Sequence, residues 1–222
     1  MKDKKKVVLF WSGGKDSAMA LKRIKEDPNL EIVSLVSTFD ALSSEIKFHG
    51  VPEVLITQQA QLMGLPLIRV YLPQDCTNEQ YREALDKYLR LFKAKGVELV
   101  AFGDIHLEDI REYREGLLAP YELEAYFPLW KEDPKDLLNE LLTSGHRVII
   151  SSVNEAVLPI RFLAKELSHE LVEQFENIDI LGENGEYHSF VTFGPTFKMR
   201  VLFSKNVTIS QGPYTVCKLR EA

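Results

Sequence analysis

Apolar segments and amphipathic segments alternate along the first two-thirds of the chain. Short runs of Val, Ile, Leu and Phe predict buried strands, which we place at residues 7–11, 31–39, 67–71, 97–102 and 147–153. Between these runs, apolar positions recur every three or four residues, which predicts helices at residues 17–26, 52–63, 78–95 and 134–144. Strands that alternate with helices in this way indicate βαβ units and a parallel sheet covered on both faces.

Two of the predicted helices carry boundary signals. Thr77 and Gln80 have the spacing of a capping box, and Gly96 marks the end of the helix that they begin. Asp133 followed by Pro134 predicts the start of another helix, because Asp caps helices and Pro suits the first helical position.

The pattern changes after about residue 176. Residues 182–195 are rich in turn formers, and residues 199–219 alternate between apolar and polar side chains as antiparallel strands do. We therefore predict an α/β domain with a Rossmann-like parallel sheet over residues 1–125. A smaller α+β domain is predicted to follow over residues 126–222.

Composition narrows the class of protein. The 222 residues carry a net charge of −6, which argues mildly against a duplex-binding nucleic-acid module. The two cysteines, Cys76 and Cys217, are too few for a disulfide framework or a four-cysteine zinc site and favour a reducing compartment. The basic start is followed only by a short apolar run, and no segment reaches the ~20 apolar residues of a membrane span. These features predict a cytoplasmic protein without a membrane partner.

The strongest motif is the hexapeptide Ser-Gly-Gly-Lys-Asp-Ser between the first predicted strand and the first predicted helix. Its two glycines let the backbone approach a ligand closely, and the helix N-terminus attracts an anion. Lys15 adds a positive charge, and Ser12 and Ser17 add hydroxyl donors. The motif differs from the usual P-loop, because Lys15 is followed by Asp16 instead of Ser or Thr. It predicts a phosphate site at the carboxyl edge of the sheet.

Asp16 carries further information about that site. A carboxylate next to phosphates is repelled unless a cation lies between them, so Asp16 predicts Mg²⁺ held together with phosphate oxygens. The alternative is that Asp16 only complements the dipole of the helix that it begins.

Two later segments add candidate residues. Gly103 and Asp104 follow the fourth predicted strand, and Arg114 lies in the polar segment after them. Glu183, Glu186 and His188 share a glycine-rich loop, where two carboxylates and an imidazole can bind ammonium or transfer protons. From position alone, Asp104 is equally well a turn residue, Arg114 part of a solvated helix face, and the loop a surface turn.

The hexapeptide resembles the pyrophosphate loop of N-type ATP pyrophosphatases, which have the adenine nucleotide alpha hydrolase-like fold. Together with Phe-His-Gly-Val at 48–51, Gly-Leu-Pro-Leu at 64–67, Pro-Leu-Trp at 128–130 and the segment 182–190, it resembles the diphthine–ammonia ligase family. This resemblance extends from Val7 to about Phe197. It implies that ATP adenylates a carboxylate of diphthine, a modified histidine of translation elongation factor 2, and that ammonia then displaces AMP.

The resemblance also implies roles for individual residues. The residues expected to hold the phosphates are Ser12, Gly13, Gly14, Lys15, Asp16 and Ser17. Thr38 and Phe39 are expected near adenine, and Gly103 and Asp104 beside the α phosphate. The residues expected to face the acceptor carboxylate or ammonia are His49, Arg114, Glu183, Glu186 and His188. The catalytic set expected from this resemblance is Lys15, Asp16, Asp104, Glu183 and Glu186.

Two departures from the family pattern keep other functions open. Phe193 stands where family members commonly carry an acid, and the loop reads Gly-Glu-Asn-Gly instead of Gly-Glu-Gly-Gly. One alternative is adenylation of an RNA base for thiolation. The negative net charge of the chain and the lack of a Cys-x-x-Cys pair argue against it. The other is a sensor that binds ATP or AMP without turnover. The chain has no recognisable glutaminase segment, so free ammonia is the expected nitrogen source, and a homodimer is compatible with the sequence.

Overall fold

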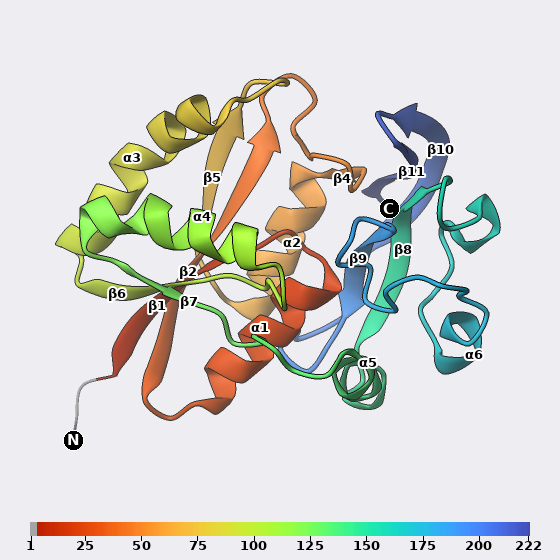
Figure 1. Ribbon diagram of the computed structural model, residues 1–222, viewed down its shortest axis with the longest axis horizontal. Coiled ribbons are helices and arrows are strands. Elements are labelled where there is room, and N and C mark those ends of the chain that lie inside the picture. Colours follow the sequence, from red (N-terminus) through yellow and green to blue (C-terminus); the bar gives the residue numbers. More distant parts are fainter. Residues whose placement is uncertain (1–3) are drawn as a thin grey trace.

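The computed structural model describes residues 4–222 and contains a five-stranded sheet in which every neighbouring pair is parallel (Figure 1). The strands follow the order β5-β2-β1-β6-β7. Their bounds are Lys5–Phe10 for β1, Leu30–Asp40 for β2, Leu67–Leu72 for β5, Val97–Ala101 for β6 and Glu124–Tyr126 for β7. The predicted Rossmann-like parallel sheet is confirmed. Its order reverses between β1 and β6, where open α/β sheets bind their ligands.

Helices cover both faces of this sheet. They are α1 (Lys15–Glu26), α2 (Glu53–Met63), α3 (Asn78–Ala94) and α4 (Glu108–Leu118). Leu85 and Phe92 of α3 and Leu117 of α4 share a buried cluster with Val8 and Val100 of the sheet, so α3 and α4 lie on one face. The helices α1 and α2 lie on the opposite face (Figure 1).

The predicted helix boundaries are confirmed at two sites. Thr77 accepts a hydrogen bond from the Gln80 backbone N–H while the Gln80 side chain accepts one from the Thr77 N–H, which completes the capping box of α3. Asp133 accepts hydrogen bonds from the backbone N–H groups of Lys135 and Asp136 at the start of α5 (Pro134–Thr143). These caps satisfy N–H groups that the first helical turn leaves without partners.

A second sheet is antiparallel and has the order β10-β11-β8-β9. Its bounds are Arg147–Asn154 for β8, Tyr187–Phe193 for β9, Phe203–Gln211 for β10 and Tyr214–Glu221 for β11. The smaller elements are β3 (Glu45–Ile46), β4 (Val51–Pro52), η1 (Ala119–Tyr121), η2 (Ile160–Phe162) and α6 (His169–Val172). The predicted domain boundary at 125/126 falls within β7, which the sequence pattern did not predict; the division into two domains stays a prediction. None of the helices in residues 4–222 combines the length and the apolar character that crossing a bilayer requires.

One core joins the two sheets. Leu9 and Leu35 of the parallel sheet belong to the same buried cluster as Ile56 of α2 and Phe190 and Val191 of β9. The helices α1 and α2 therefore pack on the parallel sheet with one side and on the antiparallel sheet with the other (Figure 1). This arrangement brings β9 beside the start of α1, where the phosphate motif lies.

An ion-pair network holds α5 against α1. The Arg23 guanidinium of α1 contacts both Glu132 and Glu140, and Lys22 Nζ lies 2.8 Å from Glu140 Oε1. The hydrogen bonds from Arg23 lower the pKa of the Glu140 carboxyl to about 2, against the opposing effect of its partial burial. Because several charges share this network, it stabilises the fold more than an isolated surface pair would.

We expect Glu140→Gln to destabilise the protein by about 1–2 kcal/mol at pH 7, because a charged partner of Arg23 and Lys22 is lost. The pKa of Glu140 is below its ordinary value, so its stabilisation is complete above about pH 4.5 and disappears as the pH falls toward 2. Urea unfolding at several pH values would measure this, with the exposed Glu173→Gln as the control. A deficit that stays constant from pH 7 to pH 3 would contradict the assignment.

Candidate active site at the carboxyl edge of the parallel sheet

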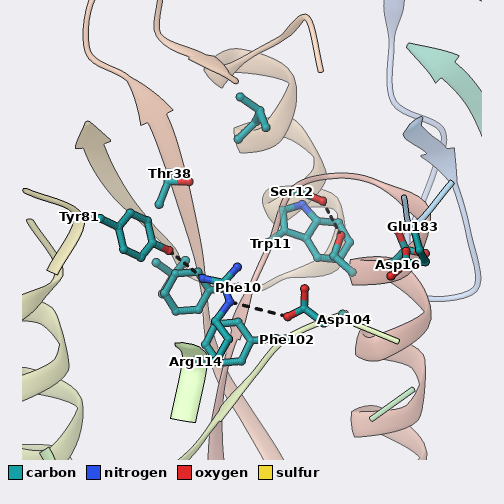
Figure 2. A pocket seen from close by; sticks show the side chains of 14 residues that line it. Phe10, Trp11, Ser12, Asp16, Thr38, Tyr81, Phe102, Asp104, Arg114 and Glu183 are labelled. Atoms are coloured by element: carbon teal, nitrogen blue, oxygen red, sulfur yellow. Dashed lines mark hydrogen bonds and ion pairs between the residues drawn. The ribbon is translucent and has the colours of Figure 1, made fainter. Parts of the chain in front are cut away.

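A cavity of about 220 Å³ lies over the carboxyl ends of β1, β2 and β6. Figure 2 draws the side chains around it, with Thr38 and Tyr81 at one end and Asp16 and Glu183 at the other. Those that the sequence predicted as site residues are Ser12, Asp16, Ser17, Thr38, Gly103, Asp104, Arg114 and Glu183. Segments more than 160 residues apart in sequence thus meet around one cavity, at the place where the parallel sheet predicts a ligand.

The glycine motif forms a tight loop between β1 and α1. Gly13 has φ +80°, and a Cβ there would stand 2.5 Å from Ile56 Cδ1, so both its conformation and its surroundings require glycine. A Cβ on Gly103 would stand 2.9 Å from the Asp16 carbonyl carbon. Gly103 therefore allows the end of β6 to approach the first turn of α1, and the two segments together form one wall of the site.

Lys15 lies behind this wall, and its side chain does not line the cavity. It is only 4% exposed, and its Nζ is 2.8 Å from Asp16 Oδ2 and 5.3 Å from the centre of the Tyr187 ring. Burial lowers the pKa of Lys15, but the neighbouring Asp16, Tyr187 and Glu183 together raise it by more than burial lowers it. The pKa of Lys15 is therefore above its ordinary value. Lys15 is therefore a fixed positive charge beneath the phosphate loop.

The cavity collects carboxylates in surroundings that disfavour their charged forms. Burial and then the charge of Asp16 raise the pKa of Glu183 to about 8, although Lys15 opposes the shift. Burial also raises the pKa of Asp104, although the Arg114 guanidinium lowers it. A cation in the cavity would relieve this repulsion. Within residues 4–222, no group of three or more His, Cys, Asp or Glu side chains is arranged to hold a metal ion, so a cation here would need ligands from the substrate as well.

Arg114 of α4 occupies the middle of the site (Figure 2). Its guanidinium donates a hydrogen bond of 3.2 Å to the Tyr81 hydroxyl and lies 4.6 Å from the centre of the Phe102 ring. Its Nε is 3.7 Å from Asp104 Oδ2. The planar cation is thus held by a carboxylate, a hydroxyl and a ring face, which fixes its direction toward the cavity.

Two further predicted residues, Phe39 and Glu186, lie away from the cavity. The Phe39 side chain is fully buried in the core, because neighbouring residues of a strand point to opposite faces and Thr38 takes the face of the cavity. Glu186 is buried, and its carboxylate accepts 3.0 Å hydrogen bonds from the backbone N–H groups of Asp179 and Asn184. Glu186 therefore shapes the loop that carries Glu183.

The two predicted histidines stack on each other beside the site. The rings of His49 and His188 are 4.3 Å apart, and Tyr214 lies 4.7 Å from His188. Burial lowers the pKa of His49 to about 4 and that of His188 well below its ordinary value, so both rings are neutral at pH 7. Neither lines the cavity. Phe193, where the chain departs from the family pattern, also lies outside it and packs against the core.

Sequence reasoning missed the aromatic residues of the site and the side chain that holds its loop. Phe10, Trp11, Tyr81 and Phe102 line the cavity, although the apolar pattern predicts them as strand or helix core. Gln59 of α2 is fully buried. It accepts a hydrogen bond from Trp11 Nε1 and donates to the carbonyls of Gly13 and Val191. The sequence offered one signal for this residue: Gln59 is a polar side chain on a helix face that is otherwise apolar.

We expect Glu183→Gln to stabilise the nucleotide-free protein at alkaline pH. The pKa of Glu183 in the native state is above the ordinary value, so between about pH 4.5 and 8 the native state binds more protons than the unfolded state. Wild-type stability therefore falls through this window, and the advantage of Glu183→Gln should grow to about 1–3 kcal/mol at pH 8.5.

Thermal or urea unfolding in EDTA at pH 5, 7 and 8.5 would measure the difference, with the exposed Glu173→Gln as the baseline. An advantage that is the same at pH 5 and pH 8.5 would show that Glu183 does not titrate in this way.

Comparison with known proteins supports the resemblance. Residues 5–117 match the family model of the diphthamide synthase N-terminal domain, and residues 133–219 match that of the diphthamide synthase C-terminal domain. A diphthine–ammonia ligase of Danio rerio is 29% identical to this chain, and the alignment covers 92% of this chain and 88% of the length of that enzyme. The diphthine–ammonia ligase of Rattus norvegicus is also 29% identical, and the alignment covers 89% of this chain and 82% of the length of that enzyme. For the Schizosaccharomyces pombe enzyme the identity is 26% over 97% of this chain, which spans only 39% of that longer protein.

Among solved structures, the U34-tRNA thiolase NcsA from Methanococcus maripaludis, with its [4Fe-4S] cluster, is 19% identical and has a TM-score of 0.42. The match covers 64% of this chain and 58% of that one, and its similarity is too low to assign chemistry. The two family models, by contrast, together cover most of the chain. The chain belongs to the diphthamide synthase family.

Proposed function

We propose that this protein is an ATP-dependent, AMP-forming carboxylate–ammonia ligase that acts in the cytoplasm. Its acceptor in this proposal is diphthine on elongation factor 2, or a related carboxylate. The observation that supports it most is the cavity at the switch point of the sheet, which combines a glycine loop with Asp104, Arg114 and Glu183. Relatives that align over nine-tenths of the chain are named diphthine–ammonia ligase.

In this proposal the loop of residues 12–17 holds the β and γ phosphates of ATP. The helix α1 begins within this loop, so the positive end of its dipole suits an anion, and Lys15 adds a buried positive charge 2.8 Å from Asp16. Asp16 would hold Mg²⁺ through the phosphates, a role that fits the crowding of carboxylates around Glu183. When bound, Mg²⁺ supplies positive charge that stabilises the departing pyrophosphate.

The far end of the cavity would hold the nucleoside. Thr38 and the main chain at Phe39 lie at the end of β2, and the rings of Phe10 and Phe102 offer apolar surface for an adenine. Thr38 and the phosphate loop lie at opposite ends of the cavity, with Phe10 and Phe102 beside Arg114 between them. A bound ATP would therefore present its α phosphorus near Asp104 and Arg114 (Figure 2).

The chemistry then has two steps. An oxygen of the acceptor carboxylate bonds to the α phosphorus while the bond to pyrophosphate breaks, and the positive charge of Arg114 stabilises the crowded phosphate oxygens. Next, the nitrogen of ammonia bonds to the acyl carbon while the bond to AMP breaks, and the nitrogen loses a proton. Glu183 is the candidate acceptor for that proton, because its carboxyl group lines the cavity.

The test is to incubate the protein with labelled ATP, Mg²⁺, ammonium and elongation factor 2 carrying diphthine. The proposal requires AMP and pyrophosphate as products and a mass change on the acceptor from carboxylate to amide. ADP as the sole nucleotide product would refute attack at the α phosphorus. Tight ATP binding without turnover would favour a sensor, and AMP formation that depends on added tRNA would favour RNA modification.

We expect Asp16→Asn and Lys15→Met each to lower the rate of AMP formation at least ~100-fold. Asp16 lines the cavity and the buried charge of Lys15 lies behind the loop that would hold the departing pyrophosphate, so each change alters the charge at that loop. Both changes keep the side-chain volume nearly constant, so the far-UV circular dichroism and the melting cooperativity should stay those of the wild type. Lys25→Met, on the exposed end of the same helix, is the matched control and should retain full activity. Wild-type turnover in either loop variant would exclude the loop from the mechanism.

A further inference from the structure

A second cavity, of about 520 Å³, adjoins the nucleotide cavity. The two share Thr38, Tyr81 and Arg114, so they adjoin along one side. The remaining wall comes from the N-terminal parts of α3 and α4 and from the segment around Lys47 and Cys76. This space is larger than the nucleotide cavity and lies away from the phosphate loop, whose residues do not line it.

Two polar atoms at this junction lack protein partners. Tyr113 Oη and Arg114 Nε are both buried, and neither has a hydrogen-bond partner among residues 4–222. Buried hydroxyl groups are nearly always paired, so Tyr113 Oη calls for a ligand or a water molecule, whereas Arg114 Nε has only the 3.7 Å contact with Asp104. Tyr113 lines only the second cavity, whereas Arg114 lines both.

The charges around the second cavity favour an anion. Lys47 and Arg114 line it, and the Arg82 guanidinium lies 5.6 Å from the centre of the Tyr113 ring. Asp109 is the one carboxylate among its lining residues, and it is exposed at the rim. A carboxylate that enters this cavity would thus meet Arg114 at its inner end, next to the cavity that we assign to the α phosphorus.

We propose that this second cavity binds the acceptor side chain, with its carboxylate directed to Arg114 and the Tyr113 hydroxyl. This assignment rests on the proposed function, because it identifies where the acceptor of that reaction binds. It places the acceptor on the side of α3 and α4, in a cavity that neither His49 nor His188 lines. The acceptor can then reach the α phosphorus while ATP stays in its own cavity, and Arg114 contacts both reactants.

The first test is Tyr113→Phe, which removes only the unpaired hydroxyl. We expect KM for diphthine-bearing elongation factor 2 to rise about tenfold, because a hydrogen bond to a charged group is lost, while KM for ATP stays within twofold. Tyr71→Phe, whose hydroxyl bonds to Glu53 away from both cavities, is the matched control and should change neither constant. An unchanged KM for the acceptor, or an equal rise for ATP, would overturn the proposal.

The second test uses Cys76 as a probe of occupancy and does not depend on turnover. Cys76 lines the second cavity and is partly exposed, whereas Cys217 is 4% exposed, so iodoacetamide should modify Cys76 first. Elongation factor 2 carrying diphthine should slow this alkylation at least fivefold more than the same factor with an unmodified histidine. A non-hydrolysable ATP analogue alone should leave the rate unchanged.

Protection of Cys76 by the analogue alone would instead assign the cavity to the nucleotide. Equal rates with both forms of the factor would also overturn the proposal, because the diphthine side chain would then not enter. Protection without any AMP formation would refute the proposed ligase reaction while leaving the cavity as the binding site of that side chain. Turnover without protection would leave the reaction standing and refute the cavity assignment.

Discussion

The site depends on the docking of β9 onto the glycine loop. The Val191 N–H donates a 2.9 Å hydrogen bond to the Gly13 carbonyl, and the Lys15 N–H donates one of 3.1 Å to Ser189 Oγ. Gln59 donates to the carbonyls on both sides of this contact. These bonds are buried, so none can be lost without leaving an unpaired backbone group. They attach the antiparallel sheet to the parallel one and carry the loop of Glu183 over the phosphate motif.

This attachment has an electrostatic consequence. Placing Glu183 near Asp16 and Asp104 disfavours its charged form, and Lys15 compensates only in part. The site therefore resembles many catalytic centres, in which charge repulsion is tolerated in the fold because bound substrate relieves it. A nucleotide that arrives with a divalent cation would bring the missing positive charge. The same three carboxylates then cease to repel one another, so binding and stability are expected to be linked at this cavity.

Local patterns predicted the fold well, and contacts distant in sequence account for what they missed. The capping box at Thr77 and the hexapeptide loop were predictable because their chemistry lies within a few adjacent residues. The strand β7 was not, since three residues at the edge of a sheet leave no apolar run. Glu183 was expected to face the acceptor carboxylate or ammonia by resemblance alone, because its place in the cavity depends on how β9 docks. Tyr81 and Tyr113 lie 32 positions apart on two helices, and only their packing on the sheet brings their rings within 6.4 Å.

Arg114 connects these observations, because it is the charged residue that both cavities share. Phe102 and Tyr81 hold its guanidinium from one element each, and Asp104 balances part of its charge without forming a close pair. A cation held in this incomplete way is free to bind anionic oxygens from either side. If a phosphate occupies one side and a carboxylate the other, the guanidinium lowers the repulsion between two anions that must approach within bonding distance. Repulsion between reactants of like charge opposes adenylation of a carboxylate, and a shared arginine would lower it most where the two anions are closest, in the transition state.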